Sequence, residues 1–495
     1  MPEPQNHGAS YRDPSGFVFQ TDGIYYRQVH QSYAEDYEKL MSSGLYATLV
    51  KNKWLIQHRE IPENLTASDD WYKTLLPDQI SLLTYPYEWC FGQLQDAALL
   101  TLTILTESVR QDMILKDASP YNIQFLQGSP IFIDTLSFER YDPGLPWVAY
   151  RQFCECFLFP LYLEHYTGLG TQKTLTSWPD GIPAARTARL LPWKCHWKMD
   201  LWMHVYLPAM VGARQAGRRW PGGGLDGTAG ARGPMARKPE ADKGPFSKRK
   251  LQHILINLEN ILHRLQTKGA DSTWGNYYEE TILSRSYLEE KERLCREFIQ
   301  GLSFRTALDI GANDGYFSHI LGGRDGRAGE AGRGHGEPDS NGASVLAIDS
   351  DTVCMNRLYR TIREKQISNI QPLCVDIVSP TPAIGFRNRE RASFSERVRA
   401  ELVAALAVVH HLVFGRNLPL NDIPGCFAEL TTGYLLVEFV PLEDEKVQEL
   451  IRNKSRYHLP YDAEYFEGCF RNYFSIEQKK EIPGTKRILY LMKKR

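Results

Sequence analysis

Residues 305–319 read RTALDIGANDGYFSH, and this stretch decides the fold of its half of the chain. A short aliphatic run carries Asp309 near its end, small residues follow at 311–315, and a helix-like pattern then begins. This order is typical of a buried strand that turns into a helix whose N-terminus faces a ligand. Small residues also let the backbone approach that ligand closely. The stretch therefore predicts a nucleotide-type cofactor loop at the carboxyl edge of a sheet.

The strands around this loop predict the fold class. From residue 305 onward, apolar runs alternate with helical stretches: RTALDI, SVLAID, IQPLCVD, ELVAALAVV and GYLLVEFV. Continuous apolar strands separated by helices indicate an α/β domain with a parallel sheet covered on both faces. The last run, FSIEQKKEIPGTKRILYLMK, contains two strand-like segments joined by a Pro-Gly turn. It predicts a terminal antiparallel hairpin on the same sheet.

Length and composition bound the remaining possibilities. At 495 residues, the chain is too long for one ordinary core, and its 42% hydrophobic content suits a folded protein. A formal net charge of -1 gives no global electrostatic case for a nucleic-acid or membrane partner. Nine cysteines without CxxC pairs suggest reduced thiols and no metal site. Because neither a signal peptide nor ~20 uninterrupted apolar residues are found, we expect a cytoplasmic protein.

Two stretches of unusual composition divide the chain. The segments 211–246 and 322–343 are rich in glycine and arginine and have little to bury, so we interpret them as a flexible linker or insert and a loop insert. The predicted organisation is an N-terminal domain over 10–210, a helical lead-in over 247–300 and an α/β domain over 301–495.

The glycine pattern distinguishes between two classes of cofactor. Dinucleotide-binding loops follow G-x-G-x-x-G, whereas this loop places Gly311, Asn313 and Gly315 at alternate positions and has Tyr316 next. With Asp309 before it, the loop resembles motif I of class I S-adenosylmethionine-dependent methyltransferases, with asparagine in place of the middle glycine. Asparagine tolerates left-handed backbone conformations, so this replacement is mild.

Two more carboxylates occupy positions that fit this resemblance. Asp349 ends the second strand, where an acid can accept both ribose hydroxyls. It follows Gly311 by 38 residues, and by 16 once the 22-residue insert is removed, against the usual spacing of about 20. Asp376 ends the third strand, where these methyltransferases place a residue beside the adenine amine. The resemblance thus implies a cofactor site made by Asp309, Gly311, Asn313, Gly315, Asp349 and Asp376.

The C-terminal half further resembles a bacterial methyltransferase group that includes NoeA-like nodulation proteins. The resemblance runs from about Trp274 to the end, and more diffusely into the N-terminal half. Glu401 stands where such proteins usually carry aspartate before the fourth strand. The resemblance implies a Rossmann-like, seven-stranded sheet and S-adenosylmethionine as the cofactor. It leaves the methyl acceptor open, with a slight preference for a small metabolite or a glycan precursor.

Methyl transfer mainly requires positioning of the nucleophile and, for some acceptors, removal of its proton. The fourth strand, ELVAALAVVHHL, brings His410 and His411 to the carboxyl edge, and imidazole titrates near neutrality. Since adjacent strand residues point to opposite faces, we expect at most one of the two to face the substrate. Glu438, at the end of the fifth strand, is a further candidate base. A structural role is the alternative for all three.

A second group of polar residues lies in the N-terminal half. Asp117, Asn122 and Asp134 follow the order found in protein-kinase-like and aminoglycoside-phosphotransferase-like folds, with Leu115 where the kinase histidine would stand. The resemblance implies an α+β kinase-like domain that binds ATP and Mg²⁺ if it is active. No glycine-rich loop precedes Lys51 or Lys53, so the phosphate lysine cannot be assigned.

These observations favour a methyltransferase whose N-terminal domain binds the substrate or regulates the enzyme. A phosphotransferase with an accessory methyltransferase-like domain and a non-catalytic binding protein are the alternatives. An N-terminal domain unrelated to kinases also stays open.

Overall fold

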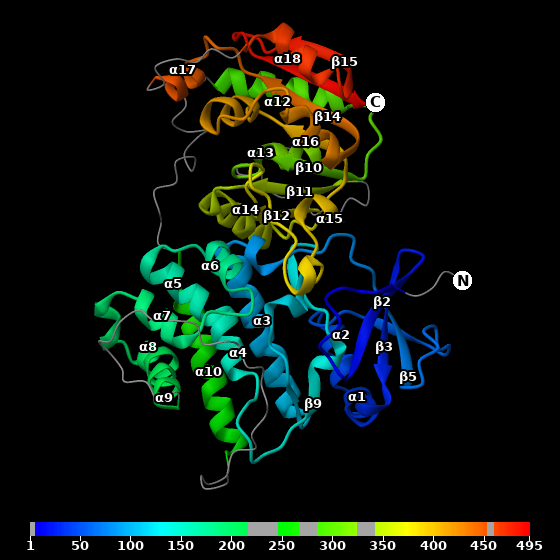
Figure 1. Cartoon of the computed structure of the whole chain (residues 1–495), viewed down its shortest axis with the longest axis vertical. Helices are drawn as coiled ribbons and strands as arrows, with labels where there is room; N and C mark the ends of the chain where they lie inside the picture. Colours follow the sequence, from blue (N-terminus) through cyan, green and yellow to red (C-terminus); the bar gives the residue numbers. More distant parts are fainter. Residues whose placement is uncertain (1–4, 216–245, 268–284, 324–341, 453–459) are drawn as a thin grey trace.

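The computed structural model describes residues 5–215, 246–267, 285–323, 342–452 and 460–495. The chain forms a C-terminal part built on one large sheet, at the top of Figure 1, and an N-terminal α+β part below it. The predicted linker 211–246 and the predicted insert 322–343 lie mostly outside the described residues.

The C-terminal sheet has seven strands in the order β12-β11-β10-β13-β14-β16-β15. The first five are parallel, while β16 pairs antiparallel with both β14 and β15. The strand order reverses at β10, which places the loop after β10 at the switch point where such sheets bind ligands. The predicted Rossmann-like, seven-stranded sheet and its terminal antiparallel hairpin are confirmed. The strands are β10 (Thr306–Ile310), β11 (Ser344–Asp349), β12 (Ile370–Cys374), β13 (Ala400–Ala405), β14 (Thr431–Phe439), β15 (Phe474–Glu481) and β16 (Ile488–Lys494).

Helices between the strands cover this sheet. Contacts join α13 to β10 and β11, α14 to β11 and β12, α16 to β13 and β14, and α12 to β16. Such crossovers bury both sheet faces, which explains why the strands are almost continuously apolar. The helices are α12 (Arg285–Ile299), α13 (Tyr316–Leu321), α14 (Thr352–Lys365), α15 (Phe394–Arg397), α16 (Ile423–Leu430), α17 (Glu445–Ile451) and α18 (Ala463–Phe470).

The two ends of the predicted insert 322–343 lie side by side. A Cβ built on Gly342 would stand 2.7 Å from the carbonyl oxygen of Gly322. The Asn369 side chain donates to the carbonyl oxygens of both Gly322 and Ala343, each at 3.0 Å. The chain therefore leaves and rejoins the fold at one place, so α13 and β11 are arranged as if a short loop joined them.

The N-terminal part contains one five-stranded antiparallel sheet and two small antiparallel pairs. The larger sheet has the order β1-β2-β3-β5-β4, and two helices separate β3 from β4 in the chain. The strands are β1 (Gln5–Asn6), β2 (Gly16–Thr21), β3 (Ile24–His30), β4 (His58–Ile61), β5 (Trp71–Pro77), β6 (Met113–Leu115), β7 (Ile123–Leu126), β8 (Ser129–Phe132) and β9 (Phe138–Arg140).

The helices α2, α5 and α10 pack on α3, which is buried along most of its length. In the contact with α10, the Gln95 side chain donates to two carbonyl oxygens near the end of α10. The predicted lead-in 247–300 is thus divided in its described residues, since α10 packs on the N-terminal part and α12 packs on the large sheet. The α-helices are α1 (Ala34–Ser42), α2 (Leu45–Lys51), α3 (Phe91–Arg110), α4 (Tyr150–Phe153), α5 (Phe159–Thr167), α6 (Thr171–Ser177), α7 (Ala184–Leu190), α8 (Met199–Leu201), α9 (Leu207–Gln215) and α10 (Lys248–Arg264).

The two parts meet along α3 and α14 (Figure 1). The backbone N–H of Gly92 donates to Asn356 Oδ1 at 2.8 Å, and Tyr359 OH donates to Asp96 Oδ2 at 2.7 Å. A buried ion pair between Arg397 and Glu88 lies beside this contact. Because α14 follows β11 directly, the N-terminal part rests on the element that begins just after Asp349.

Candidate active site

The loop after β10 makes the tight turn that its sequence predicts. Gly311, Asn313 and Gly315 have φ values of 72°, 52° and 85°, all in the left-handed region. A Cβ on Gly311 would stand 2.7 Å from Val408, and one on Gly315 would stand 2.5 Å from Leu358. Both glycines are therefore required by conformation and by packing, and Asn313 fills the middle position with the conformation expected of it.

Asp349 lies directly against this loop. Its Oδ2 accepts from the backbone N–H of Asn313 at 3.0 Å, and its Oδ1 accepts from the backbone N–H of Asp351 at 2.8 Å. Burial raises the pKa of Asp349, although these backbone donors oppose the effect. Each carboxylate oxygen keeps a second lone pair. Asp349 can therefore accept hydroxyl donors while it holds the loop in place.

Asp309 is buried below the loop, with 2% of its surface exposed. Ser318 of α13 donates to its Oδ2 at 2.6 Å. Burial raises the pKa of Asp309 to about 6, against the opposing effects of the Ser318 hydrogen bond and the nearby Lys291. In this arrangement, Asp309 ties the strand to the following helix and does not project into open space.

Asp376 follows β12 at the same edge of the sheet. Its Oδ1 accepts from the backbone N–H of Val378 at 3.0 Å, and its Oδ2 pairs with the guanidinium of Arg416. Arg416 comes from the segment after β13. The ion pair therefore joins the segment after β12 to the segment after β13, on either side of the loop after β10. About half of the Arg416 side chain is exposed.

The two histidines do not lie on a strand. β13 ends at Ala405, Ala407 turns the chain with φ 56°, and His411 begins a π-helical turn that runs to Gly415. The alternation argument is therefore wrong, because the strand stops before the histidines. Their ring centroids are only 4.1 Å apart. The small residues of β13 pack in the sheet core, and the turn at Ala407 redirects the chain toward the loop.

The His410 imidazole is fully buried, that of His411 is partly buried, and both are neutral at neutral pH. His410 is fully buried, and neither ring nitrogen has a hydrogen-bond partner among the described residues. Burial, with further effects from His411, Arg487 and Lys291, lowers the pKa of His410 well below its ordinary value. Burial, with Arg487 and Lys446, lowers that of His411 to about 4. A base with so low a pKa accepts protons weakly, which limits the predicted general-base role.

Glu438 is the centre of a buried charge network. Its carboxylate lies 2.6 Å from Lys291 Nζ and 3.4 Å from Arg487 Nη1, and Tyr287 OH donates to it at 2.8 Å. Burial raises the pKa of Glu438, but the two cations outweigh burial and lower it overall. Arg487 also pairs with Asp444 at 2.8 Å. A fully buried carboxylate held by two cations is a poor proton acceptor, so the geometry argues against Glu438 as a catalytic base.

Two of the three N-terminal candidate residues, Asn122 and Asp134, are joined by a chain of hydrogen bonds through Ser137. The Asn122 side chain donates to Ser137 Oγ at 3.2 Å, and Ser137 donates in turn to Asp134. Arg27 of β3 forms an ion pair with Asp134. Asp117 is held separately, since its Oδ1 accepts from the Gln152 side chain at 2.9 Å. The three predicted residues thus lie on one short segment, but the Asp134 carboxylate already faces a cation.

The sequence reasoning missed four cations at these sites: Lys291, Arg487, Arg416 and Arg27. Lys291 carried a usable signal, because it occupies the apolar stripe of α12 between Leu288 and Cys295. A lysine at such a position needs a buried partner. The other three cations, all arginines, do not interrupt a comparable apolar pattern in the sequence. No cluster of potential metal ligands occurs in the parts of the chain that the structure covers.

Comparison with known proteins places the chain close to one curated protein. The chain is a homologue of nodulation protein NoeA from Rhizobium meliloti (strain 1021), with 28% identity over 99% of this chain and 96% of the relative. The resemblance to the NoeA-like group is thereby confirmed over the full length. No family model matches the chain.

Solved methyltransferase structures overlap parts of the chain. The N-methyltransferase NodS from Bradyrhizobium japonicum WM9, in complex with S-adenosyl-L-homocysteine, is 14% identical with a TM-score of 0.30, covering 46% of this chain and 93% of NodS. The bifunctional kinase-methyltransferase WbdD is 15% identical with a TM-score of 0.27, covering 42% of this chain and 38% of WbdD.

Proposed function

We propose that the protein is an S-adenosylmethionine-dependent methyltransferase. The observation that carries the proposal is the contact between the loop and Asp349, at the switch point of a sheet whose seventh strand is antiparallel. Two left-handed glycines bring the backbone close to the cofactor position, and the second lone pairs of Asp349 suit the ribose hydroxyls. The residues present therefore fit this cofactor.

The other residues of the site would orient the cofactor and the acceptor. Asp376 lies where the adenine amine would donate, so Arg416 would have to share or release this carboxylate on binding. Asp309 would hold α13 so that its N-terminus faces the methionine end. The bound cofactor supplies an activated methyl group on sulfur, and the chain's part is to align the acceptor with it.

His411 is the better of the two histidines for taking a proton from the acceptor. It is partly exposed, whereas His410 is fully buried. A pKa of about 4 keeps the His411 imidazole neutral above pH 5, so it can accept a proton, although only as a weak base. His410, which lacks a partner within the described part of the chain, would support His411 by ring contact.

Calorimetry with S-adenosylmethionine on the wild type and on Asp349→Ala tests this proposal. We expect micromolar binding that weakens at least about tenfold in the variant, because a charge-assisted hydrogen bond is worth about 1.5–3 kcal/mol. Asp351→Ala is the matched control, since it removes a carboxylate two residues away that caps α14. No binding by a folded wild type would overturn the proposal.

For the acceptor, we propose a small metabolite or a glycan precursor, on the strength of the similarity to a nodulation protein. An extract of the host incubated with radiolabelled cofactor and the wild-type protein should yield one labelled small product. Label in protein or RNA alone would contradict this acceptor class while leaving methyl transfer intact.

We further propose that the N-terminal part is a kinase-like scaffold that binds substrate rather than a phosphotransferase. Its order of strands around Asp117, Asn122 and Asp134 suits that fold, but Arg27 neutralises the carboxylate that magnesium would need. The arrangement as it stands does not fit magnesium. Calorimetry with ATP and Mg²⁺ should show no binding, whereas tight binding abolished by Asp134→Ala would favour a phosphotransferase.

A further inference from the structure

The segment from η6 (Trp193–Trp197) to α9 carries an unusually apolar outer face. Trp193, Trp197 and Met199 are 70%, 86% and 72% exposed, and further exposed apolar side chains follow at helical spacing. We define this outer face as the 193–211 surface, made of Trp193, Trp197, Met199, Met203, Leu207 and Val211. It runs from η6 through α8 and the π-helical turn Trp202–Tyr206 to α9. Figure 1 shows α8 and α9 at the far side of the N-terminal part from the large sheet.

The inner face of the same helices is also apolar, and it is buried. Leu201, Val205 and Ala209 are each 3% exposed or less and belong to the core. A solvated surface helix normally places polar residues opposite its buried stripe. Here both faces are apolar, and large contiguous apolar patches on a protein surface mark interaction sites. The 193–211 surface is therefore built to contact a partner.

The charges around this surface have one dominant sign. Between residues 184 and 211 the cations are Arg186, Arg189, Lys194 and Lys198, and Asp200 is the single acidic residue. Exposed lysines are uncommon at the centre of protein–protein interfaces, which favour aromatic residues and arginine. Tryptophan together with lysine is instead typical of segments that lie in the headgroup region of an anionic bilayer.

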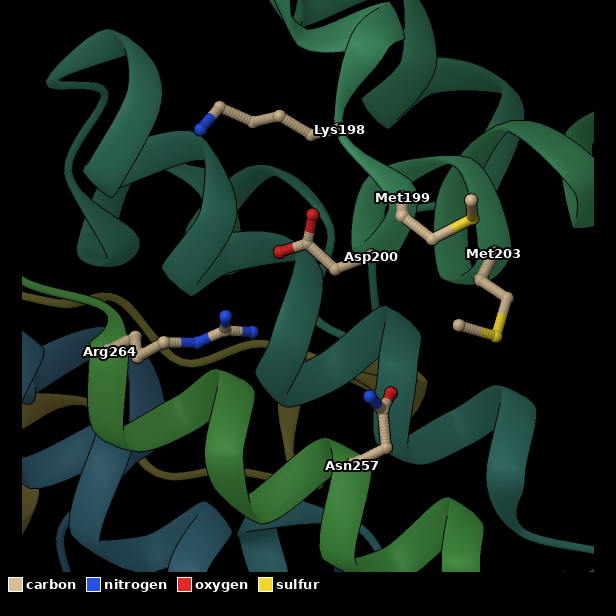
Figure 2. Close-up of a pocket in the computed structure, with 6 residues that line it drawn as sticks. All are labelled: Lys198, Met199, Asp200, Met203, Asn257 and Arg264. Carbon is tan, nitrogen blue, oxygen red and sulfur yellow. The ribbon is translucent and has the colours of Figure 1, made fainter.

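A small cavity adjoins the 193–211 surface and extends the same chemistry. It has a volume of about 320 Å³ and is lined by Lys198, Met199, Asp200, Met203, Asn257 and Arg264. Figure 2 shows Lys198 and Arg264 on one side of this space and the two methionines on the other. Two cations against one carboxylate make the cavity net positive. Its size and charge suit a phosphate headgroup, and its methionines suit the adjoining acyl region.

We propose that the 193–211 surface docks the protein on anionic phospholipid membranes, with Lys198 and Arg264 beside the lipid headgroups and the Asp200 carboxylate between these two cations. The tryptophans would lie at headgroup depth, and the lysines would attract the surface charge. The contact is peripheral: among the residues that the structure covers, no helix is long and apolar enough to cross a bilayer. The overall charge of -1 hides this local excess of cations.

Flotation of the full chain with vesicles tests the proposal. We expect binding to phosphatidylcholine–phosphatidylglycerol vesicles to exceed binding to phosphatidylcholine alone by at least about tenfold at about 0.1 M salt, and to fall at higher salt. Trp193→Ala/Trp197→Ala and Lys198→Glu/Arg264→Glu should each lower the association constant at least about tenfold. Thermal melting and circular dichroism verify that each variant is folded.

Matched substitutions elsewhere distinguish binding through this surface from non-specific adsorption to vesicles. Phe386→Ala/Tyr473→Ala removes two aromatic side chains that are 60% and 42% exposed on other segments, and Lys51→Glu/Lys365→Glu reverses two other exposed charges. Both controls should bind within about twofold of the wild type. Absence of wild-type binding to anionic vesicles would overturn the proposal. So would unchanged binding by the tryptophan variant, or self-association of wild type that this variant abolishes without any vesicle binding.

Discussion

Some buried residues of the candidate site have pKa values shifted from their ordinary values. The pH dependence of stability therefore tests the structure of the site directly. Asp309 is the clearest case, because burial raises its pKa from 3.8 to about 6. The unfolded chain then loses this proton at lower pH than the folded chain. The stability contribution of Asp309 therefore falls as pH rises from about 4 to 6, and the full penalty is present at neutral pH.

We predict that Asp309→Asn stabilises the protein at pH 7.5 and not near pH 4. The full shift corresponds to about 3 kcal/mol, and an amide can still accept from Ser318, so a gain of about 1–3 kcal/mol is expected. Urea unfolding at the two pH values measures it. Destabilisation that is larger at pH 7.5 than near pH 4 would contradict the prediction, because it would show that the ionised carboxylate contributes favourably.

His410 gives the second residue-scale prediction. Its pKa is lowered and it has no partner within the described residues, so its protonation on unfolding destabilises the folded state increasingly as pH falls below 6.5. His410→Leu should be neutral or up to about 1 kcal/mol more stable at pH 7.5, and should lose less stability at pH 5.5. His253→Leu, an exposed position on α10, is the control and should alter neither value. Thermal melting at both pH values distinguishes them.

At the scale of elements, the buried charge network fixes α12 to the large sheet. Lys291 comes from α12, Glu438 from β14, and Arg487 from the turn before β16. Lys291 also lies 4.7 Å above the ring of Phe317 in α13. The network thus sets the position of the helices that flank the loop.

We predict that Lys291→Met destabilises the protein by about 3 kcal/mol, because Glu438 would keep only part of its compensation. Arg293→Met, on the exposed face of the same helix with partners Glu290 and Glu297, should cost less than about 1 kcal/mol. Denaturant unfolding compares the two. Similar costs for both would mean that the Glu438 network adds little to stability.

Elements were also the scale at which the sequence was most informative. The second strand was predicted with its observed bounds, because its run of aliphatic residues is unbroken and ends at the polar residue Asp349. The fourth strand was predicted too long. Val408 and Val409 favour a strand by type, but Ala407 turns the chain and Val408 packs on Gly311, a tertiary contact that no local pattern contains.

The same distinction explains the candidate site. Gly311, Gly315 and Asp349 were found because their roles follow from backbone conformation and strand order. The partners of Glu438 and Asp376 were missed because Arg487 and Arg416 come from distant segments that only the folded chain brings together.

For the whole molecule, the contact between α3 and α14 makes the two parts interdependent. Asn356 is buried, and it is the acceptor for the backbone N–H at the start of α3. Gln93 of α3 donates to the carbonyl oxygen of Pro372 in β12, so the contact reaches a strand of the large sheet as well as the helix α14. The N-terminal part therefore supports the strands that present Asp349 and Asp376.

We predict that Asn356→Ala destabilises both parts together by about 1–3 kcal/mol, since it leaves a buried N–H without an acceptor. Arg363→Ala on the same helix removes a more exposed ion pair with Asp96 and should cost less than about 1 kcal/mol. Calorimetric melting should show one shifted transition for Asn356→Ala. A shift confined to one of two separate transitions would show that the parts unfold independently.

The adjacent ends of the segment between α13 and β11 have a practical consequence. Because Gly322 and Gly342 already touch, the length of chain between them is free to vary without strain on the sheet. A compact reporter protein can be grafted there in place of residues 324–341, within one strand and one helix of the glycine loop after β10. Searches that demand a fixed interval between the glycines and their acid will overlook proteins built this way.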